Sequence, residues 1–210
     1  MTVLLTYGDS NTHGTPPILE LGEYRRFDAA TRWPALVGRA LGWEVVEEGL
    51  PGRTAQFDDP VMGPHMNGQD GLKIALQSHG PIDALTIMLG TNDVKARFGA
   101  SPELVTGGVA RLLDIAFSEE LQARHGGFGV LLICPPPVVE VGPIKTQFYG
   151  GRARSLALPP LYAGLAAAYG AAFLDAGQHI EVSMIDGVHF EPEAHGVLAA
   201  AVADKLRSMM

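Results

Sequence analysis

Gly8-Asp9-Ser10-Asn11 is the stretch that decides the fold, and the apolar segment Val3-Leu4-Leu5-Thr6-Tyr7 comes directly before it. A short apolar run that ends at a glycine indicates a buried strand followed by a tight turn. Gly8 allows the sharp bend, and the next residues can present free backbone N–H groups beside the Ser10 hydroxyl. Ligands of open α/β sheets bind at the carboxyl edge, so we expect Ser10 to lie there. An ordinary turn with a capping Asp or Ser would fit the same four residues.

Beyond this turn, apolar runs of strand length alternate with segments of helical periodicity. This alternation predicts a mainly parallel sheet with helices on both faces, a three-layer α/β/α sandwich. The length of 210 residues favours a single domain, residues 1–210. We expect strands at 3–7, 43–47, 82–89, 128–134 and 171–174, and helices at 31–41, 72–79, 102–124, 159–169 and 192–210.

Three details of the chain's course are also predicted. Thr31 is expected to be the N-cap of the first long helix. Segments 12–28 and 138–151 have loop composition, and both are expected to crowd the serine. Phe148 and Tyr149, in the second of these segments, are expected to be exposed.

Composition restricts the partners of the chain. The net charge is −8 and no basic run is present, which argues against nucleic acid or an anionic membrane surface as a partner. The single cysteine, Cys134, cannot form an intrachain disulfide and fits a reducing compartment. Without a signal-peptide pattern or an apolar stretch of membrane-spanning length, a cytoplasmic location is expected.

The expected loops at the sheet edge carry four stretches of chemical interest. These are Gly8-Asp9-Ser10, the glycine loop around Gly52, Gly90-Thr91-Asn92-Asp93, and Asp186-Gly187-Val188-His189. In this order they resemble the SGNH hydrolases, also called the GDSL family of esterases. The resemblance covers nearly the whole chain, and it implies the SGNH hydrolase fold with a flavodoxin-like sheet of five parallel strands.

Two longer stretches, residues 47–54 and 87–93, look like the bacterial arylesterase and acyltransferase branch of this family. Many members have leucine where this chain has Asn11, a departure that affects packing and substrate preference but not the catalytic groups. The resemblance implies hydrolysis of short-chain acyl esters, such as aryl or alkyl acetates, with acyl transfer to alcohols or peroxide as a side activity. It also implies no cofactor and assembly into a homo-oligomer.

A serine hydroxyl needs a base within hydrogen-bonding distance, usually a histidine whose tautomer is fixed by a carboxylate. Of the seven histidines, only His189 has an acid three residues before it, Asp186. We therefore predict Ser10 as nucleophile, His189 as base and Asp186 as its orienting acid. His13, three residues from Ser10, is the competing base, and Asp186 as a simple turn cap is the structural alternative.

Acyl transfer places negative charge on the former carbonyl oxygen, and donors must be positioned there in advance. The predicted donors are the backbone N–H groups of Ser10 and Gly52 and the side-chain amide of Asn92. A simple Pro-Gly turn at Gly52 and a loop-bracing role for Asn92 are the structural alternatives. We further predict that Asn11, His13, Phe148 and Val188 contact the substrate.

Several other functions are compatible with parts of the sequence. No histidine pair or cysteine cluster has metal-ligand spacing, so no metal is expected. A carbohydrate O-acetylesterase, a thioesterase and a lysophospholipase are the enzymatic alternatives. A binding module on a flavodoxin-like fold is the non-enzymatic alternative. The first loop lacks a glycine-rich phosphate cradle, which argues against a nucleotide binder.

Overall fold

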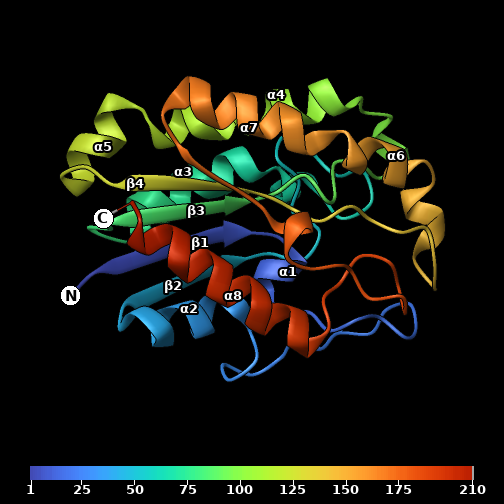
Figure 1. Cartoon of the computed structure of the whole chain (residues 1–210). Helices are drawn as coiled ribbons and strands as arrows, with labels where there is room; N and C mark the ends of the chain where they lie inside the picture. Colours follow the sequence, from blue (N-terminus) through green and yellow to red (C-terminus); the bar gives the residue numbers. More distant parts are fainter. Residues whose placement is uncertain (210) are drawn as a thin grey trace.

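Five parallel strands form one sheet in the order β2-β1-β3-β4-β5, and helices cover both of its faces (Figure 1). The computed structural model describes residues 1–209. The strands are β1 Val3–Gly8, β2 Glu44–Gly49, β3 Ala84–Met88, β4 Gly129–Cys134 and β5 Ala172–Asp175. The helices are α1 Ser10–His13, α2 Trp33–Leu41, α3 Gly68–Ser78, α4 Pro102–Ala116, α5 Glu119–His125, α6 Gly151–Leu156, α7 Leu158–Tyr169 and α8 Pro192–Arg207.

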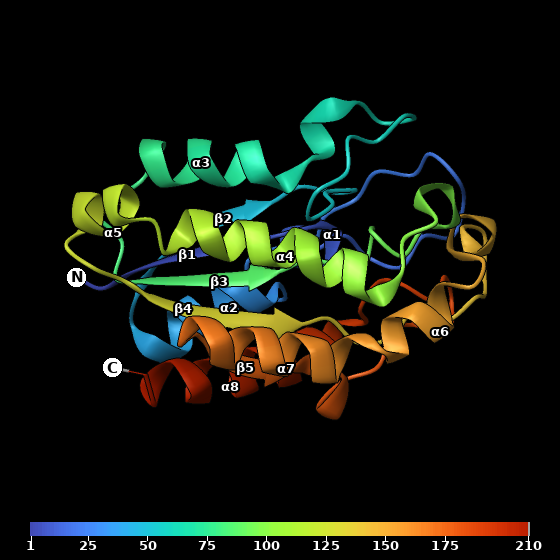
Figure 2. The same cartoon turned by 90° about the horizontal axis from the view of Figure 1, so that it is seen from above.

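Alternation along the strands sends side chains into two separate cores. Leu5 and Leu85 belong to the core on one face, where α3, α4 and α7 pack. Leu4 and Met88 belong to the core on the other face, which α2 and α8 cover. Figure 2 shows α3, α4 and α7 side by side along the sheet. This confirms the predicted three-layer α/β/α architecture.

The order in which strands are added to the sheet changes side between β1 and β3. It adds β2 on one side of β1 and then β3, β4 and β5 on the other, which is the flavodoxin-like strand order. Gly8 pairs with Met88, so the carboxyl ends of these two strands lie level. The loops that follow them therefore meet at the point where α/β sheets bind their ligands.

The structure corrects several predicted boundaries. The helix predicted at 102–124 is two helices, because the chain turns at Phe117 and Ser118 accepts the Leu121 N–H as the N-cap of α5. Thr31 does not cap α2, whose N-cap is Arg32 without a side-chain bond. Helix α6 was not predicted. The predicted end of the last helix, Met210, lies outside the described residues; α8 ends at Arg207.

No helix in the described part of the chain has both the length and the apolar character needed to cross a membrane.

Two adjacent glycines in α4 give a test of this packing. Gly107 is exposed, and a Cβ there would meet nothing within 4 Å, whereas a Cβ at Gly108 would lie 2.8 Å from Cδ and Cγ of Gln56. Alanine in a helix is favoured over glycine by about 1 kcal/mol. We expect Gly107→Ala to raise the melting temperature by about 2–4 °C and Gly108→Ala to lower it. Equal shifts in thermal melts of the two variants would contradict this packing.

Candidate active site

Ser10 is the first residue of α1, directly beyond the end of β1. Asp9 is the N-cap of this helix, and its carboxylate accepts the backbone N–H of Asn11 at 2.9 Å. The turn is tight: a Cβ on Gly8 would lie 2.0 Å from Oγ1 of Thr12. This turn fixes the Ser10 hydroxyl at the carboxyl edge of the sheet, as predicted from the sequence.

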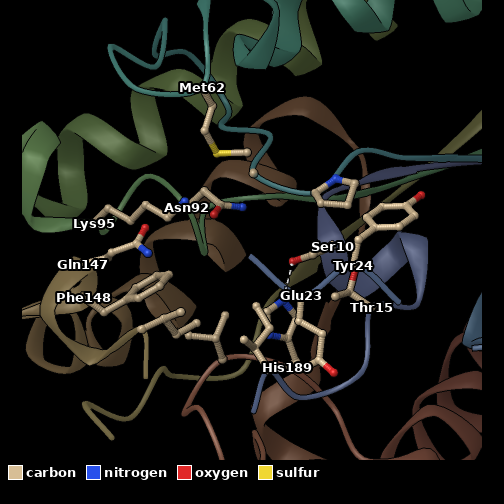
Figure 3. Close-up of a pocket in the computed structure, with 15 residues that line it drawn as sticks. Ser10, Thr15, Glu23, Tyr24, Met62, Asn92, Lys95, Gln147, Phe148 and His189 are labelled. Atoms are coloured by element: carbon tan, nitrogen blue, oxygen red, sulfur yellow. Dashed lines mark hydrogen bonds between the residues drawn. The ribbon is translucent and has the colours of Figure 1, made fainter. Parts of the chain in front are cut away.

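His189 lies between Ser10 and Asp186 and is hydrogen-bonded to both. Its Nδ1 is 2.6 Å from Oδ2 of Asp186. Its Nε2 is 3.0 Å from Oγ of Ser10, the bond drawn as a dashed line in Figure 3. An ionised carboxylate can only accept hydrogen bonds, so Nδ1 carries the proton and the Nδ1–H group donates a hydrogen bond to Asp186. Nε2 is then the unprotonated nitrogen that accepts the Ser10 O–H, the arrangement required of a general base.

The Asp186 carboxylate is fully buried and accepts three backbone N–H groups besides the imidazole. Val188 and His189 donate to Oδ1, both at 2.9 Å, and Ile18 donates to Oδ2 at 2.7 Å. Burial alone would raise the pKa of Asp186, but the bonds from His189 and Ile18 outweigh it and hold the pKa below its ordinary value. The lowered pKa keeps the Asp186 carboxylate ionised at neutral pH, so that it can accept the hydrogen bond from His189.

The three residues predicted to supply oxyanion donors, Ser10, Gly52 and Asn92, line the same cavity. Among the described residues, neither the Ser10 nor the Gly52 backbone N–H has an acceptor. Gly52 has φ +93°, a backbone conformation that strains any residue with a Cβ and therefore favours glycine. Nδ2 of Asn92 donates to the Arg53 carbonyl at 3.0 Å and to Oδ2 of Asp9 at 3.3 Å. To bind an oxyanion, the amide N–H that donates to Asp9 would have to donate to the oxyanion as well.

Arg53 holds the glycine loop against the sheet. Its buried guanidinium donates to the Gly8 carbonyl at 3.0 Å and to the Glu48 carbonyl, and it stacks 4.1 Å from the ring centroid of Tyr7. The same residue's backbone carbonyl fixes the Asn92 amide. Arg53 thus links the ends of β1 and β2 to two of the three predicted oxyanion donors.

Two more carboxylates are buried beneath these loops. Asp93 accepts the Ala55 N–H on both oxygens, at 2.9 and 3.0 Å, and joins the loop after β3 to the glycine loop. Burial raises the pKa of Asp93 to about 7 and that of Asp9 to about 6. Both groups therefore titrate near neutral pH.

A cavity of about 180 Å³ opens beside the Ser10–His189 pair (Figure 3). One side is lined by Lys95, Gln147 and Phe148, and the opposite side by Thr15 and Tyr24. The remaining lining residues are Ile18, Glu23, Pro51, Gly52, Met62, Asn92, Ile144 and Val188.

The structure separates the four predicted substrate contacts into two pairs. Phe148 and Val188 line the cavity, although Phe148 is only 2% exposed rather than on the surface. Asn11 lies outside the lining: its amide donates to the Val188 carbonyl, and its own carbonyl accepts the Trp33 indole N–H. The His13 ring also lies outside the lining.

His13 is not placed to activate the serine. Its Nδ1 is 3.0 Å from Oγ1 of Thr15, and its Nε2 is 3.4 Å from the Tyr24 hydroxyl. Burial lowers its pKa, and the guanidinium groups of Arg26 and Arg32 lower it further. His13 therefore contacts two cavity residues, Thr15 and Tyr24, and does not contact Ser10.

Sequence reasoning missed Lys95 and Tyr24. Lys95 lies three residues after Asn92 and is only 5% exposed. Burial and the nearby Arg97 lower its pKa to about 8, although Asp59, Asp9 and Asp93 act in the opposite direction. Its proximity to the Gly90-Thr91-Asn92-Asp93 stretch was the one available signal. Tyr24 gave none, because loop 12–28 has no periodicity.

No group of three or more His, Cys, Asp or Glu residues within residues 1–209 is arranged to hold a metal ion.

A hydrogen-bonded serine, histidine and aspartate at the switch point of a parallel sheet is typical of an α/β serine hydrolase. The sequence model of the GDSL-like lipase/acylhydrolase family matches residues 6–197. The chain belongs to this family, as the sequence analysis predicted.

Solved structures from two organisms resemble the chain over its full length. A carbohydrate acetylesterase from Sinorhizobium meliloti is 33% identical with a TM-score of 0.94, and each chain is covered completely. The native M. smegmatis aryl esterase is 32% identical, also with a TM-score of 0.94 and complete coverage of both chains. A comparison with curated protein sequences found no match. The two structures confirm the SGNH hydrolase fold.

The raised pKa of Asp93 gives a pH-dependent test. Its folded pKa of about 7 lies well above the ordinary value of an aspartate, so the ionised form destabilises the fold, and this loss of stability is complete above pH 7. Asn in its place keeps an acceptor for the Ala55 N–H and carries no charge. We expect the stability of Asp93→Asn relative to wild type to rise by about 2–3 kcal/mol from pH 5 to pH 8.

Denaturant unfolding at both pH values measures this change. Asp204→Asn, which removes a carboxylate from the exposed end of α8, controls for net charge. A stability difference for Asp93→Asn that does not change with pH would contradict the assignment.

Proposed function

We propose that this chain is a serine esterase that hydrolyses short-chain acyl esters through an acyl-enzyme, and that residues 1–210 form a single hydrolase domain. The observation that carries the proposal is the unbroken hydrogen-bonded chain from Asp186 through His189 to Ser10, which ends in a cavity. Family membership and the esterase neighbours support acyl-ester hydrolysis.

In the proposed first half-reaction, Oγ of Ser10 attacks the ester carbonyl while Nε2 of His189 takes its proton. Asp186 stabilises the resulting imidazolium. The oxyanion accepts from the N–H groups of Ser10 and Gly52 and from the Asn92 amide. The tetrahedral intermediate then expels the alcohol, which takes the proton from His189, and Ser10 is left acylated.

In the second half-reaction, His189 removes a proton from water as the water attacks the acyl group. Collapse of this intermediate releases the carboxylic acid and returns the proton to Ser10. An alcohol or hydrogen peroxide in place of water would yield a new ester or a peracid. We propose these acyl transfers as side activities of the same acyl-enzyme.

The size of the cavity supports a preference for short acyl groups. Its volume of about 180 Å³ is below the range of about 300–1,000 Å³ that drug-sized ligands occupy. Buried Phe148, Ile144 and Val188 are part of its wall. An acetyl group needs little of this space, whereas an octanoyl chain would have to displace the wall.

A carbohydrate O-acetylesterase is the second candidate. Beside the resemblance to the S. meliloti acetylesterase, Thr15, Tyr24 and Glu23 place polar groups on the cavity wall. Such groups can bind sugar hydroxyls. A cytoplasmic location and a homo-oligomeric state stay predictions, to be tested by fractionation and light scattering.

The roles of Ser10 and His189 can be tested together. A serine-directed fluorophosphonate should add to Ser10 alone, and Ser10→Ala should abolish both labelling and ester hydrolysis. His189→Ala should lower kcat by about 10⁴-fold or more. His13→Ala is the matched control and should retain most of kcat, because His13 contacts Thr15 and Tyr24 instead of the nucleophile. Labelling of another residue, or a larger loss in His13→Ala, would refute the assignment.

The acyl-size prediction needs a separate panel. Acetate, butyrate and octanoate esters of one phenol should give kcat/KM values that fall with chain length. Acetylated sugars in the same assay separate the two candidates. A maximum at octanoate would rule out the short-chain proposal.

A further inference from the structure

Lys95 has a largely buried side chain in the cavity wall, and its ammonium group has no carboxylate partner in the described part of the chain. Its side chain is 5% exposed and belongs to the same cavity lining as Ser10 and Asn92. Within residues 1–209, no carboxylate oxygen lies within 4.0 Å of its Nζ, and no acceptor is hydrogen-bonded to it. The ring centroid of Phe148 is 5.7 Å from Nζ. Burying a cation is unfavourable unless it is paired.

The carboxylates nearest to Lys95 are engaged elsewhere. Asp59 lies 3.2 Å from the Arg97 guanidinium and accepts the backbone N–H groups of Val61 and Met62. Asp93 accepts from Ala55. Asp9, likewise, accepts from Asn11 and Asn92. The negative charges of these three carboxylates favour the protonated form of Lys95 from a distance, but none of them forms an ion pair with its ammonium group.

Gln147 adds a second donor on the same side of the cavity. Its Oε1 accepts from Nη2 of Arg97 at 3.4 Å, which leaves the Nε2 amide as its free end. Figure 3 shows Lys95, Gln147 and Phe148 together on one side of Asn92. A substrate group that reaches this side meets hydrogen-bond donors, with the apolar ring of Phe148 beside them.

We propose that Lys95 and Gln147 form a subsite for a carboxylate carried by the ester substrate. The enzyme then prefers small monoanionic esters over neutral esters of the same shape. A substrate carboxylate can accept hydrogen bonds from both donors, and its negative charge would neutralise the Lys95 ammonium group. The cavity of about 180 Å³ allows only a short linker between this carboxylate and the reacting carbonyl. This inference rests on the proposed esterase function, because it names the substrate class of the same site.

The carboxylate can belong to the acyl arm or to the alcohol arm, and four esters distinguish the two. Monoethyl succinate carries it on the acyl arm, with ethyl levulinate as the neutral ketone of similar shape. Acetoxyacetate carries it on the alcohol arm, with acetoxyacetone as its neutral counterpart. Binding is measured by calorimetry on Ser10→Ala, which cannot turn the esters over.

We expect one carboxylate ester to bind about tenfold or more tightly than its ketone counterpart. Lys95→Met in the Ser10→Ala background should abolish this preference, and Lys95→Gln, which also lacks the charge, should weaken it. Lys145→Met removes an exposed charge from the neighbouring turn and should leave the preference intact. Loss of the buried charge should also raise the melting temperature of Lys95→Met, which verifies its folding.

Equal binding of both members of each pair would overturn the subsite, and so would a preference that survives in Lys95→Met. Turnover is measured separately with Ser10 intact. Selective binding without hydrolysis of any ester would refute the proposed esterase and leave the carboxylate subsite standing. Hydrolysis without selective binding would do the reverse.

Discussion

The level pairing of β1 with β3 is the constraint on which the rest of the site depends. Gly8 and Met88 lie opposite each other, so the residues that follow these strands emerge together at one edge. Ser10 needs only a two-residue turn to reach this edge, and Asn92 only a short loop. Arg53 then fastens the third loop to the same strand ends. A slip in this register would separate Ser10, the proposed nucleophile, from the proposed oxyanion donors.

Hydrogen bonds to buried polar side chains hold the loops together at this edge. Asp186 collects N–H groups from loops that are distant in sequence, Asp93 ties the loop after β3 to the glycine loop, and Arg53 binds strand carbonyls. Each of these bonds is directional, and an unpaired buried partner is costly. These bonds connect the loops that carry Ser10, Gly52 and Asn92 to one another and to the strand ends.

The sequence predicted most of the framework because its signals are local. Apolar runs gave the strands, and the three-residue spacing of Asp186 and His189 gave their hydrogen bond. The break at Ser118 also has a local signal, a serine followed by two glutamates. The burial of Phe148 and Lys95 has no local signal, because these two side chains lie near each other although they are distant in sequence. Cavity walls therefore had to come from the structure, and the catalytic roles themselves stay proposals.

All five strands run in the same direction, so their carboxyl ends lie at one end of the sheet and their amino ends at the other. The start of β1 and the end of α8 lie at the end opposite the loops that carry Ser10 and Asn92 (Figures 1 and 2). A linker attached at either terminus leaves from the side away from the cavity. The protein can thus be tethered to a solid support or fused to a second module with its cavity facing outward into the medium.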